Sequence, residues 1–314
     1  MEKRILIPDT GLSICPIGLG TVNAGLAWTE EVADRIFDSY VDAGGNMIDT
    51  ARVYAAGRSE TEVGRWLKKS GKRNDLVIVT KGGHPKFDSP DDDLHISRMT
   101  KEDMRSDIET SLRELQTDYI DLYFYHRDNR AQSVEYEIEV MEEFVKEGKI
   151  RYYGCSNWDT DRIEEADAYC AKMGYRGFIA DQALLNMGMK YMNPLPDDTL
   201  VYIQDSLWDY HVNNARNLAM PYMGVASGFF HKYVRGGADA VKKSNYCTEK
   251  NLAVAEHCKE LMEKYNATIT QVVLGYFTQQ PFACAPLYGP KDGPQIVEAL
   301  QTLDIPFTKE DYDI

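Results

Sequence analysis

The sequence has 314 residues, of which 43% are hydrophobic, so it can bury the core of one enzyme-sized domain. Lys and Arg number 35 against 50 Asp and Glu, and the formal net charge of −15 opposes a nucleic-acid or anionic-membrane partner. No apolar run approaches the roughly 20 residues of a membrane helix, and residues 1–8 lack the apolar core of a signal peptide, so we expect a cytoplasmic protein.

Short apolar runs alternate with amphipathic stretches along the chain, which is the rhythm of repeated βα units and a parallel sheet. The predicted strands, in chain order, are residues 17–19, 47–49, 76–80, 120–125, 152–155, 178–180, 218–222 and 284–287. Eight strands close a barrel. The pattern therefore predicts an α/β fold, a TIM (β/α)8 barrel that occupies residues 1–314 as a single domain.

Capping signals mark the beginnings of two of the predicted helices. Thr100 precedes the stretch 104–115, whose apolar residues recur every three to four positions. Thr268 and Gln271 have the spacing of a capping box ahead of an apolar segment. A further helix is predicted near residues 202–216.

The cysteines give no sign of a metal site. There are six, scattered without a Cys-x-x-Cys pair and without zinc-like spacing to the six histidines. His257 and Cys258 are adjacent, but adjacent helical residues point about 100° apart. We expect reduced, mostly buried thiols and no metal.

Four polar residues stand at or just beyond the predicted ends of three successive strands, where barrel enzymes keep their catalytic groups. Asp49 ends the second strand and Tyr54 follows on the same loop, while Lys81 and His126 follow the third and fourth strands. Each has an ordinary alternative: a turn cap, a packing tyrosine, a strand cap and a histidine at the edge of the core. Their coincidence at neighbouring strand ends favours a catalytic site.

The chain resembles the aldo-keto reductases from near residue 3 to near residue 303. Residues 10–12 and 17–21 are similar to the family's opening hairpin and first strand, and residues 43–51 with Tyr54, 57–60 and Gly64 match the signature around its second strand. The resemblance implies a barrel with a short N-terminal hairpin and an extra C-terminal helix. It also implies a catalytic tetrad of Asp49, Tyr54, Lys81 and His126.

The chemistry of these four residues suits carbonyl reduction, which needs a hydride at carbon and a proton at the developing alkoxide. We predict that Tyr54 supplies the proton and that the Lys81 ammonium, held by Asp49, lowers the phenol pKa from about 10. His126 would hydrogen-bond the carbonyl oxygen and orient it. The predicted activity is NAD(P)H-dependent interconversion of an alcohol with a small-molecule aldehyde, ketone or sugar-derived carbonyl.

The resemblance also implies a nicotinamide site. Ser156, Asn157 and Gln182 correspond to the residues that hydrogen-bond the carboxamide, and hydroxyl and amide groups can meet both its donors and its acceptor. Alternatively, Ser156 and Asn157 cap the next helix. Tyr222 stands where the family stacks an aromatic ring on the nicotinamide. Further predicted cofactor-binding residues are Gly20, Thr21, Asp49, Gly224, Ser227, Gly289, Lys291 and Gln295.

Residues 286–295 resemble the segment that holds the adenosine end of the cofactor. Asp292 and Gln295 have the spacing of a helix cap, and the N-terminus of that helix would favour a phosphate. Lys291 can pair with a 2′-phosphate, although without the bidentate fork of arginine. We therefore expect NADP(H) in preference to NAD(H).

The substrate pocket is predicted from aromatic residues near the tetrad. Trp28 and Trp158 are expected to flank Tyr54 and His126 as walls, with loop packing as the alternative. Arg127 is expected to be a rim charge paired with the neighbouring Asp128 rather than a site for an anionic substrate.

Two other functions are compatible with parts of the pattern. A Schiff-base lyase could use Lys81 as its nucleophile, but this leaves Tyr54, Gln182 and the Ser156-Asn157 pair unexplained. A non-catalytic, cofactor-sensing subunit resembling the potassium-channel β subunits is the other alternative, and the complete tetrad weighs against it.

Overall fold

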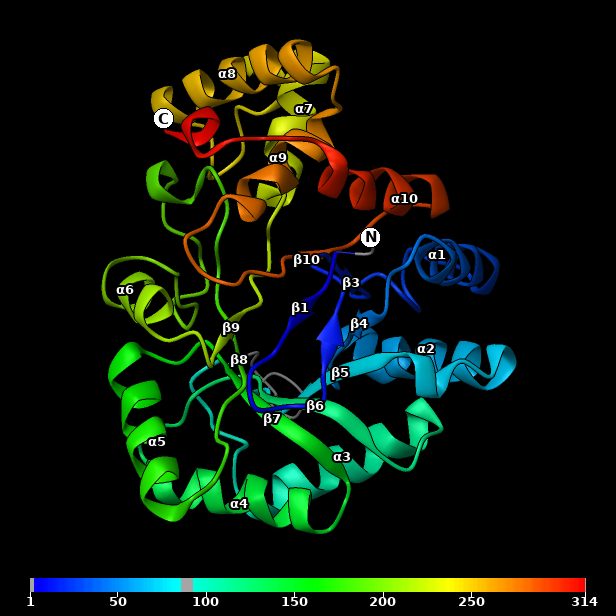
Figure 1. Ribbon diagram of the computed structural model, residues 1–314, viewed down its shortest axis with the longest axis vertical. Helices are drawn as coiled ribbons and strands as arrows, with labels where there is room; N and C mark the ends of the chain where they lie inside the picture. Colours follow the sequence, from blue (N-terminus) through cyan, green and yellow to red (C-terminus); the bar gives the residue numbers. More distant parts are fainter. Residues whose placement is uncertain (1–2, 86–92, 314) are drawn as a thin grey trace.

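The computed structural model describes residues 3–85 and 93–313, and its centre is a sheet of eight parallel strands. The sheet order is β10-β3-β4-β5-β6-β7-β8-β9. The two edges meet because the Leu287 amide donates to the Pro221 carbonyl at 2.9 Å and Ala219 bridges Cys284. The predicted barrel is confirmed (Figure 1).

Each predicted strand overlaps an observed one. The barrel strands are β3 (Gly18–Gly20), β4 (Met47–Asp49), β5 (Val77–Gly82), β6 (Ile120–Tyr125), β7 (Ile150–Ser156), β8 (Ala180–Gln182), β9 (Leu218–Ala219) and β10 (Leu287–Tyr288). Two of the observed strands end later in the chain than predicted, and both ends lie at the site. Strand β5 continues beyond Thr80 and includes Lys81, and β8 ends at Gln182 rather than at Ala180.

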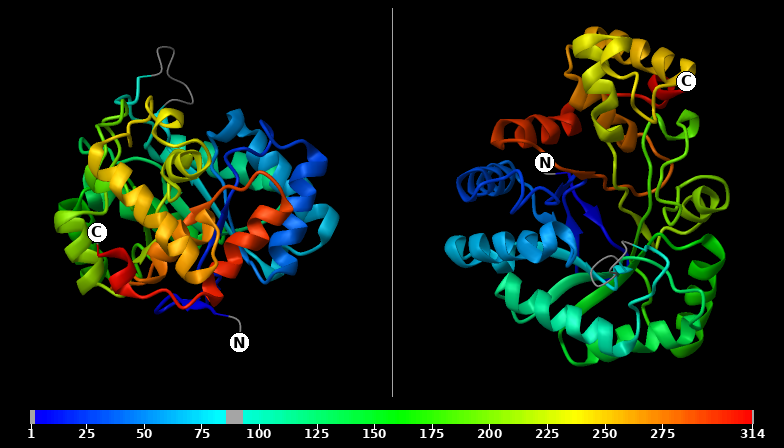
Figure 2. Two further views of the ribbon diagram at one scale, coloured as in Figure 1. Left: turned by 90° about the horizontal axis from the view of Figure 1, so that it is seen from above. Right: turned by 180° about the vertical axis from the view of Figure 1, so that it is seen from behind.

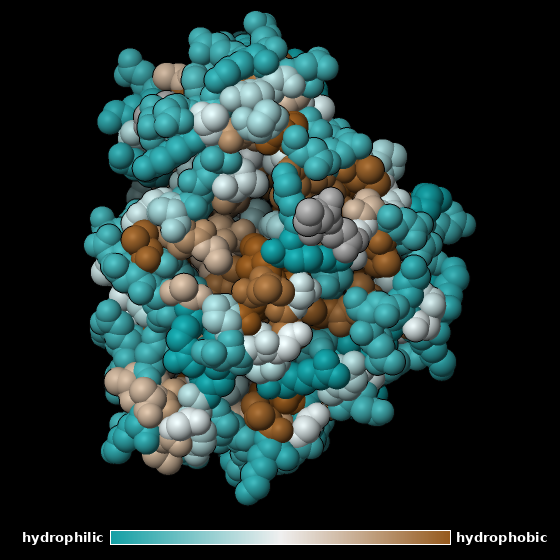
Figure 3. Space-filling model, viewed as in Figure 1, coloured by the Kyte–Doolittle hydropathy of each residue, from teal (hydrophilic) through white to brown (hydrophobic). Residues whose placement is uncertain are grey.

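The predicted N-terminal hairpin closes one end of the barrel. Strands β1 (Ile5–Leu6) and β2 (Ser13–Ile14) pair antiparallel. Ile14 and Leu12 are buried in one cluster with barrel-interior residues such as Met47 and Phe124. The hairpin lies across the front of the barrel in Figure 1, where Figure 3 shows hydrophobic residues gathered near the centre of a mostly hydrophilic face.

Helices surround the barrel and follow its strands in chain order. They are α1 (Glu30–Asp42), α2 (Arg58–Ser70), α3 (Lys101–Leu115), α4 (Val134–Lys146), α5 (Thr160–Met173), α6 (Asp205–Asn213), α9 (Ile269–Thr278) and α10 (Gly293–Gln301). Both predicted caps are confirmed, because Thr100 and Thr268 each form a capping box with the residue three positions on. The helix predicted near residues 202–216 is observed as α6, which is shorter at both ends.

Two helices between β9 and α9 were not predicted. Helices α7 (Phe229–Gly236) and α8 (Glu249–Tyr265) pack with α9 around their own hydrophobic cluster, at one end of the molecule in Figures 1 and 2. The extra C-terminal helix is the 3-10 helix η8 (Lys309–Tyr312), which docks on α8 because Asp311 accepts hydrogen bonds from Lys264 and Tyr265. No helix in the described residues is long and apolar enough to cross a membrane.

Gly64 explains part of the signature near Tyr54. A Cβ atom at this position would lie 2.0 Å from the Glu114 carbonyl oxygen, so only glycine allows α2 to approach α3 this closely. Helix α2 is thereby packed closely on α3, and it begins directly after the loop that carries Tyr54.

Candidate active site

The four predicted catalytic residues meet at the carboxyl ends of β4, β5 and β6. The Lys81 ammonium lies 2.7 and 2.9 Å from the two carboxylate oxygens of Asp49, 2.7 Å from the Thr50 carbonyl oxygen and 3.4 Å from the Tyr54 hydroxyl. Asp49 and Lys81 are each 1% exposed. Three acceptors therefore fix the ammonium at the bottom of the site, beside the phenol.

Burial raises the pKa of the Tyr54 hydroxyl, and the negative charge of Asp49 adds to this, so that together they outweigh the lowering by Lys81. The predicted lowering of this pKa is therefore wrong, because burial disfavours the phenolate and, with the Asp49 charge, outweighs the effect of the ammonium. Burial alone would lower the pKa of Lys81, but Asp49 and Tyr54 raise it above the ordinary value. At neutral pH the site holds a protonated phenol beside an ammonium.

His126 faces Tyr54 across the site. The two rings meet edge to face with centroids 5.9 Å apart, and the ring of His84 lies 4.7 Å from that of His126 on the other side. Burial, the neighbouring His84 and then Arg127 lower the pKa of His126 well below its ordinary value, so the imidazole is neutral at neutral pH. No described atom hydrogen-bonds to its buried Nδ1. His84 was not predicted, because it follows its strand without a recognisable motif.

Tyr54 begins a strained turn. In η1 (Tyr54–Gly57), Ala55 and Ala56 have φ angles of 52° and 55°, and Gly57 has a φ of 88°. Non-glycine residues seldom adopt this region, and such outliers persist only where surrounding contacts hold them. The turn presents the Tyr54 ring to the pocket and leads directly into α2.

The first residues of α2 hold this turn against the strands. The Ser59 hydroxyl lies 2.8 Å from the hydroxyls of both Thr21 and Thr50. The Thr80 hydroxyl donates to Glu60 Oε1 at 2.6 Å. Thr50 follows Asp49 and Thr80 precedes Lys81, so Ser59 and Glu60 support both members of the ion pair from behind. Ser59 and Glu60 lie in the family signature, but the sequence did not indicate that they support Asp49 and Lys81.

A cleft of about 750 Å³ extends from Asp49 and Tyr54 across the barrel mouth. It is lined by most of the predicted cofactor residues: Gly20, Thr21, Asp49, Tyr222, Gly224, Ser227, Gly289, Lys291 and Gln295. His231, Lys232 and Arg235 of α7 also line it. These basic residues were missed because α7 itself was not predicted. Lys232, Arg235 and Lys291 bring positive charge to the cleft, which Glu298 also lines, and such cations can pair with the phosphates of a dinucleotide.

The loop between β9 and α7 lines the cleft and contains several left-handed residues. Between β9 and α7, Met223, Ala226, Ser227 and Gly228 have φ angles of 55°, 49°, 52° and 75°. The amides of Ala226 and Gly228 donate to the Met223 and Val225 carbonyls at 2.8 Å, so the loop is closed by its own hydrogen bonds. The predicted cap is confirmed at α10, where Asp292 accepts from the Gln295 amide at 3.0 Å and Gln295 accepts from the Lys291 amide at 2.9 Å.

Ser156, Asn157 and Gln182 form one connected network at the ends of β7 and β8. The Gln182 amide donates to Asp49 at 2.8 Å, and the Ser156 hydroxyl donates to the Gln182 carbonyl at 2.8 Å. The Asn157 amide nitrogen donates to Ser156 at 3.0 Å. Asn157 does not cap the next helix, since Asp159 is the N-cap residue of α5. The three polar side chains therefore lie beside the tetrad.

Tyr222 is tied to the same network. Its hydroxyl donates to Asn157 Oδ1 at 2.6 Å, and its ring lines the cleft above the tetrad. A phenol held at its far end presents a fixed ring face to the cleft. The Tyr222 ring and the nearby polar side chains fit the nicotinamide end of a dinucleotide, and the cationic residues Lys232, Arg235 and Lys291 in the cleft fit its phosphates.

Residues 16–314 match the aldo/keto reductase family. The chain belongs to the aldo-keto reductases. Enzymes of this family use NAD(P)H and act on small carbonyl substrates. In the described residues, no group of three or more His, Cys, Asp or Glu side chains could hold a metal ion.

Named relatives cover almost the whole chain. An aryl-alcohol dehydrogenase of Pestalotiopsis microspora is 25% identical over 99% of this chain and 80% of its own length. An uncharacterized oxidoreductase of Bacillus subtilis is 28% identical over 96% of this chain and 91% of its own. An aryl-alcohol dehydrogenase [NADP(+)] of Phanerodontia chrysosporium is 25% identical over 98% of this chain and 83% of its own length.

Both tryptophans predicted as pocket walls of this aldo-keto reductase are core residues instead. Trp28 is 3% exposed and its indole N–H donates to the Pro290 carbonyl at 3.1 Å. Trp158 is fully buried, donates to the Arg127 carbonyl at 3.1 Å and packs against Tyr125 and Phe178. Each indole satisfies its one donor inside the protein, and neither residue lines the cleft.

Arg127 is not paired with Asp128, contrary to expectation. Its guanidinium binds Asp197 at 3.1 Å and the Thr199 hydroxyl at 2.9 Å, and the side chain is buried. Asp128 binds Arg162 of α5 instead. The loop after β8 therefore closes over the end of β6.

Proposed function

We propose that this aldo-keto reductase interconverts a carbonyl and an alcohol by hydride transfer, with Tyr54 as the proton donor in reduction and the acceptor in oxidation. The observation that carries the proposal is the Tyr54 hydroxyl 3.4 Å from a buried Lys81 ammonium that Asp49 holds. When bound, the nicotinamide cofactor supplies or accepts the hydride.

Tyr54 is suited to act as the acid because its raised pKa keeps the hydroxyl protonated at neutral pH. As hydride reaches the carbonyl carbon, the oxygen becomes an alkoxide, which is a stronger base than a phenolate and takes the Tyr54 proton. The resulting phenolate lies beside the Lys81 ammonium, which stabilises it. The ammonium thus lowers the energy of the charged product of proton transfer.

His126 is suited to orient the carbonyl because its neutral ring has one donor and one acceptor nitrogen. Burial keeps the imidazole uncharged, so it can donate a hydrogen bond to the carbonyl oxygen without competing with Tyr54 as the acid. A neutral donor beside a phenol is an arrangement that supports a developing alkoxide.

We propose aromatic aldehydes and the matching aryl alcohols as the first substrate class, on the strength of the two relatives named as aryl-alcohol dehydrogenases. We also propose NADP(H) in preference to NAD(H). Lys291 lines the cleft beside the N-terminus of α10, and Lys232 and Arg235 add positive charge along its wall. Cations there favour a 2′-phosphate.

The Schiff-base alternative is disfavoured by the contacts of Lys81. A lysine nucleophile must lose its proton, whereas three acceptors and a raised pKa keep this amine protonated. Borohydride reduction in the presence of benzaldehyde, followed by mass spectrometry, would leave a benzyl adduct on Lys81 if the lyase mechanism operated.

The test of the proposed function is benzaldehyde reduction with NADPH, followed at the cofactor absorbance, together with fluorescence titration of each cofactor. We expect saturable binding and Tyr54-dependent turnover. Binding without turnover of any aldehyde, ketone or sugar in a panel would favour the cofactor-sensing alternative. No binding of either cofactor would overturn the proposal.

A further inference from the structure

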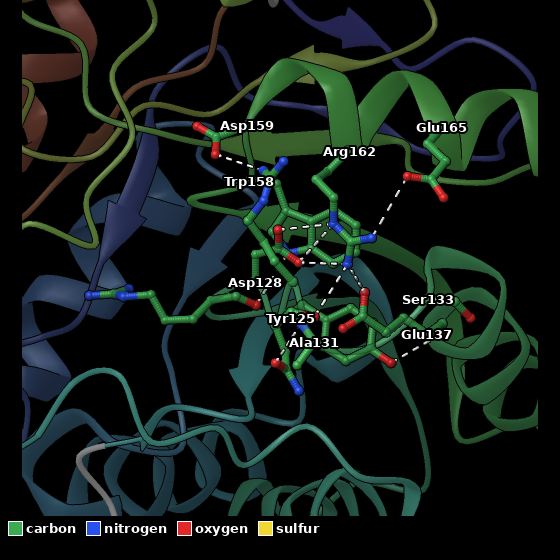
Figure 4. A network of polar contacts seen from close by, with 12 residues as sticks. Tyr125, Asp128, Ala131, Ser133, Glu137, Trp158, Asp159, Arg162 and Glu165 are labelled. Atoms are coloured by element: carbon green, nitrogen blue, oxygen red, sulfur yellow. Dashed lines mark hydrogen bonds and ion pairs between the residues drawn. The ribbon is translucent and has the colours of Figure 1, made fainter.

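A buried ion-pair network lies behind the ends of β6 and β7, outside the cofactor cleft. Arg162 of α5 contacts Asp128 through Nε at 3.1 Å and through Nη2 at 2.9 Å, and Nη2 also lies 3.0 Å from Glu137 of α4. The side chains of Arg162 and Glu137 are 7% and 0% exposed. Figure 4 shows the guanidinium pointing between the two carboxylates, beside the ring of Trp158.

The network reaches two site residues through their immediate neighbours. The guanidinium of Arg162 lies 5.2 Å from the ring centroid of Trp158, whose indole N–H donates to the Arg127 carbonyl at 3.1 Å. His126 precedes Arg127, and Asn157 precedes Trp158. Arg162 therefore contacts the two segments that directly follow His126 and Asn157 in the chain.

His126 and Asn157 are also linked directly, so a displacement of one strand end would be passed to the other. The Asn157 amide nitrogen lies 3.5 Å from the His126 carbonyl oxygen, and its amide oxygen accepts from Tyr222. His126, which is proposed to orient the carbonyl, and Asn157, which is predicted to bind the nicotinamide, therefore depend on the same contacts.

The charges favour Asp128 as the principal partner of Arg162. Burial and the neighbouring Asp128 raise the pKa of Glu137 to about 9, so Glu137 is protonated at neutral pH. One guanidinium then neutralises one carboxylate, and Arg can bind it with two donors at once, which Lys cannot do. Removing Arg162 would leave the part-buried Asp128 without this partner, which favours movement of the β6 end towards water.

We propose that Arg162 is a positioning residue that sets the placement of both His126 and Asn157 through Asp128 and Trp158. This inference rests on the proposed function for its catalytic readout, although not for its binding readout. The predicted consequence is that Arg162 affects the turnover number and cofactor affinity without touching substrate or cofactor.

The first test compares Arg162→Gln and Arg162→Lys with Arg130→Gln. Arg130 lies near the same strand ends but pairs with Asp159 and Asp161 at the surface, so it is the matched control. We expect both Arg162 variants to lower kcat for benzaldehyde about tenfold or more, since small misplacements of catalytic groups are costly. We also expect weaker NADPH binding by fluorescence titration, with the control unchanged.

The second test separates positioning from general destabilisation. If Arg162 acts through His126, Arg162→Lys should lower single-turnover rates much less in a His126→Gln background than in the wild type. Equal losses in both backgrounds, or wild-type rates and NADPH affinity in the folded Arg162 variants, would overturn the inference. Asp128→Asn serves as the second variant if Arg162→Gln does not fold, with the same expected loss.

The two proposals fail in different ways. If the wild-type protein binds NADPH but reduces no carbonyl, the proposed function fails, while the effect of Arg162→Lys on NADPH affinity still tests the inference. If the wild type reduces benzaldehyde and the Arg162 variants match it, only the inference fails.

Discussion

The Lys81 ammonium and the Asp49 carboxylate form a two-point contact, at 2.7 and 2.9 Å, with both side chains almost completely removed from water. Removing one member of such a pair leaves an uncompensated buried charge. Breaking the pair should therefore destabilise the barrel as well as stop the reaction proposed for it.

Lys81→Met should destabilise the protein by about 3–5 kcal/mol, because Asp49 then lies buried without its cation. The double variant Asp49→Asn/Lys81→Met should regain part of that loss, since no charge remains. Urea unfolding curves give both free energies. Additive losses in the double variant would show that the two side chains do not stabilise each other. Both variants should lack carbonyl reduction.

Glu60 should make the stability of the protein depend on pH. Burial raises the pKa of Glu60 from 4.5 to about 7 in the folded state. The folded protein therefore binds the proton more tightly than the unfolded chain, so the stability that this group contributes is fully present below about 4.5 and is lost as pH rises to about 7.

The measurement is the free energy of unfolding of wild type and Glu60→Gln at pH 5 and pH 7.5. Relative to the glutamine variant, the wild type should lose roughly 2 kcal/mol of unfolding free energy between these two pH values. Glu31→Gln, on the exposed face of α1, is the control and should follow the wild type. A parallel pH dependence in wild type and Glu60→Gln would contradict the buried titration.

Lys291→Ala should weaken NADPH binding about tenfold while changing NADH binding less than twofold, because only NADPH carries the 2′-phosphate. The effect of the substitution on NADPH affinity should shrink as the salt concentration is raised, since Lys291 is exposed. Fluorescence titration with each cofactor measures it, with the exposed Lys242→Ala as the control. If the two cofactors lose affinity equally, Lys291 does not recognise the 2′-phosphate.

The parts of the site that were predictable from sequence are those fixed by strand order. Asp49, Lys81 and His126 each end a separate apolar run, and parallel strands must bring those ends together. Tyr54 was predicted from the family signature. The positive φ angles of the turn that follows it are not indicated by any hydrophobic periodicity in the sequence. Ser156, Asn157 and Gln182 came from the family resemblance, and the hydrogen bonds that join them were not predicted.

The errors came from side chains whose direction depends on distant partners. Trp28 turns into the core because its indole meets the carbonyl of Pro290, which is 262 residues away along the chain. Trp158 turns inward towards Arg127 in the same way. The Tyr54 pKa is raised mainly by burial. Burial depends on how the barrel packs, which the spacing of residues along the chain does not indicate.

The most direct test of the central claim is the turnover of Tyr54→Phe beside its NADPH affinity. The account predicts a fall in kcat for benzaldehyde reduction of about 10²–10⁴-fold, because the phenol proton is used in the transition state. The dissociation constant for NADPH should stay within about twofold, because the hydroxyl is not needed to bind the cofactor. Turnover equal to that of the wild type would contradict the assignment of Tyr54 as the proton donor.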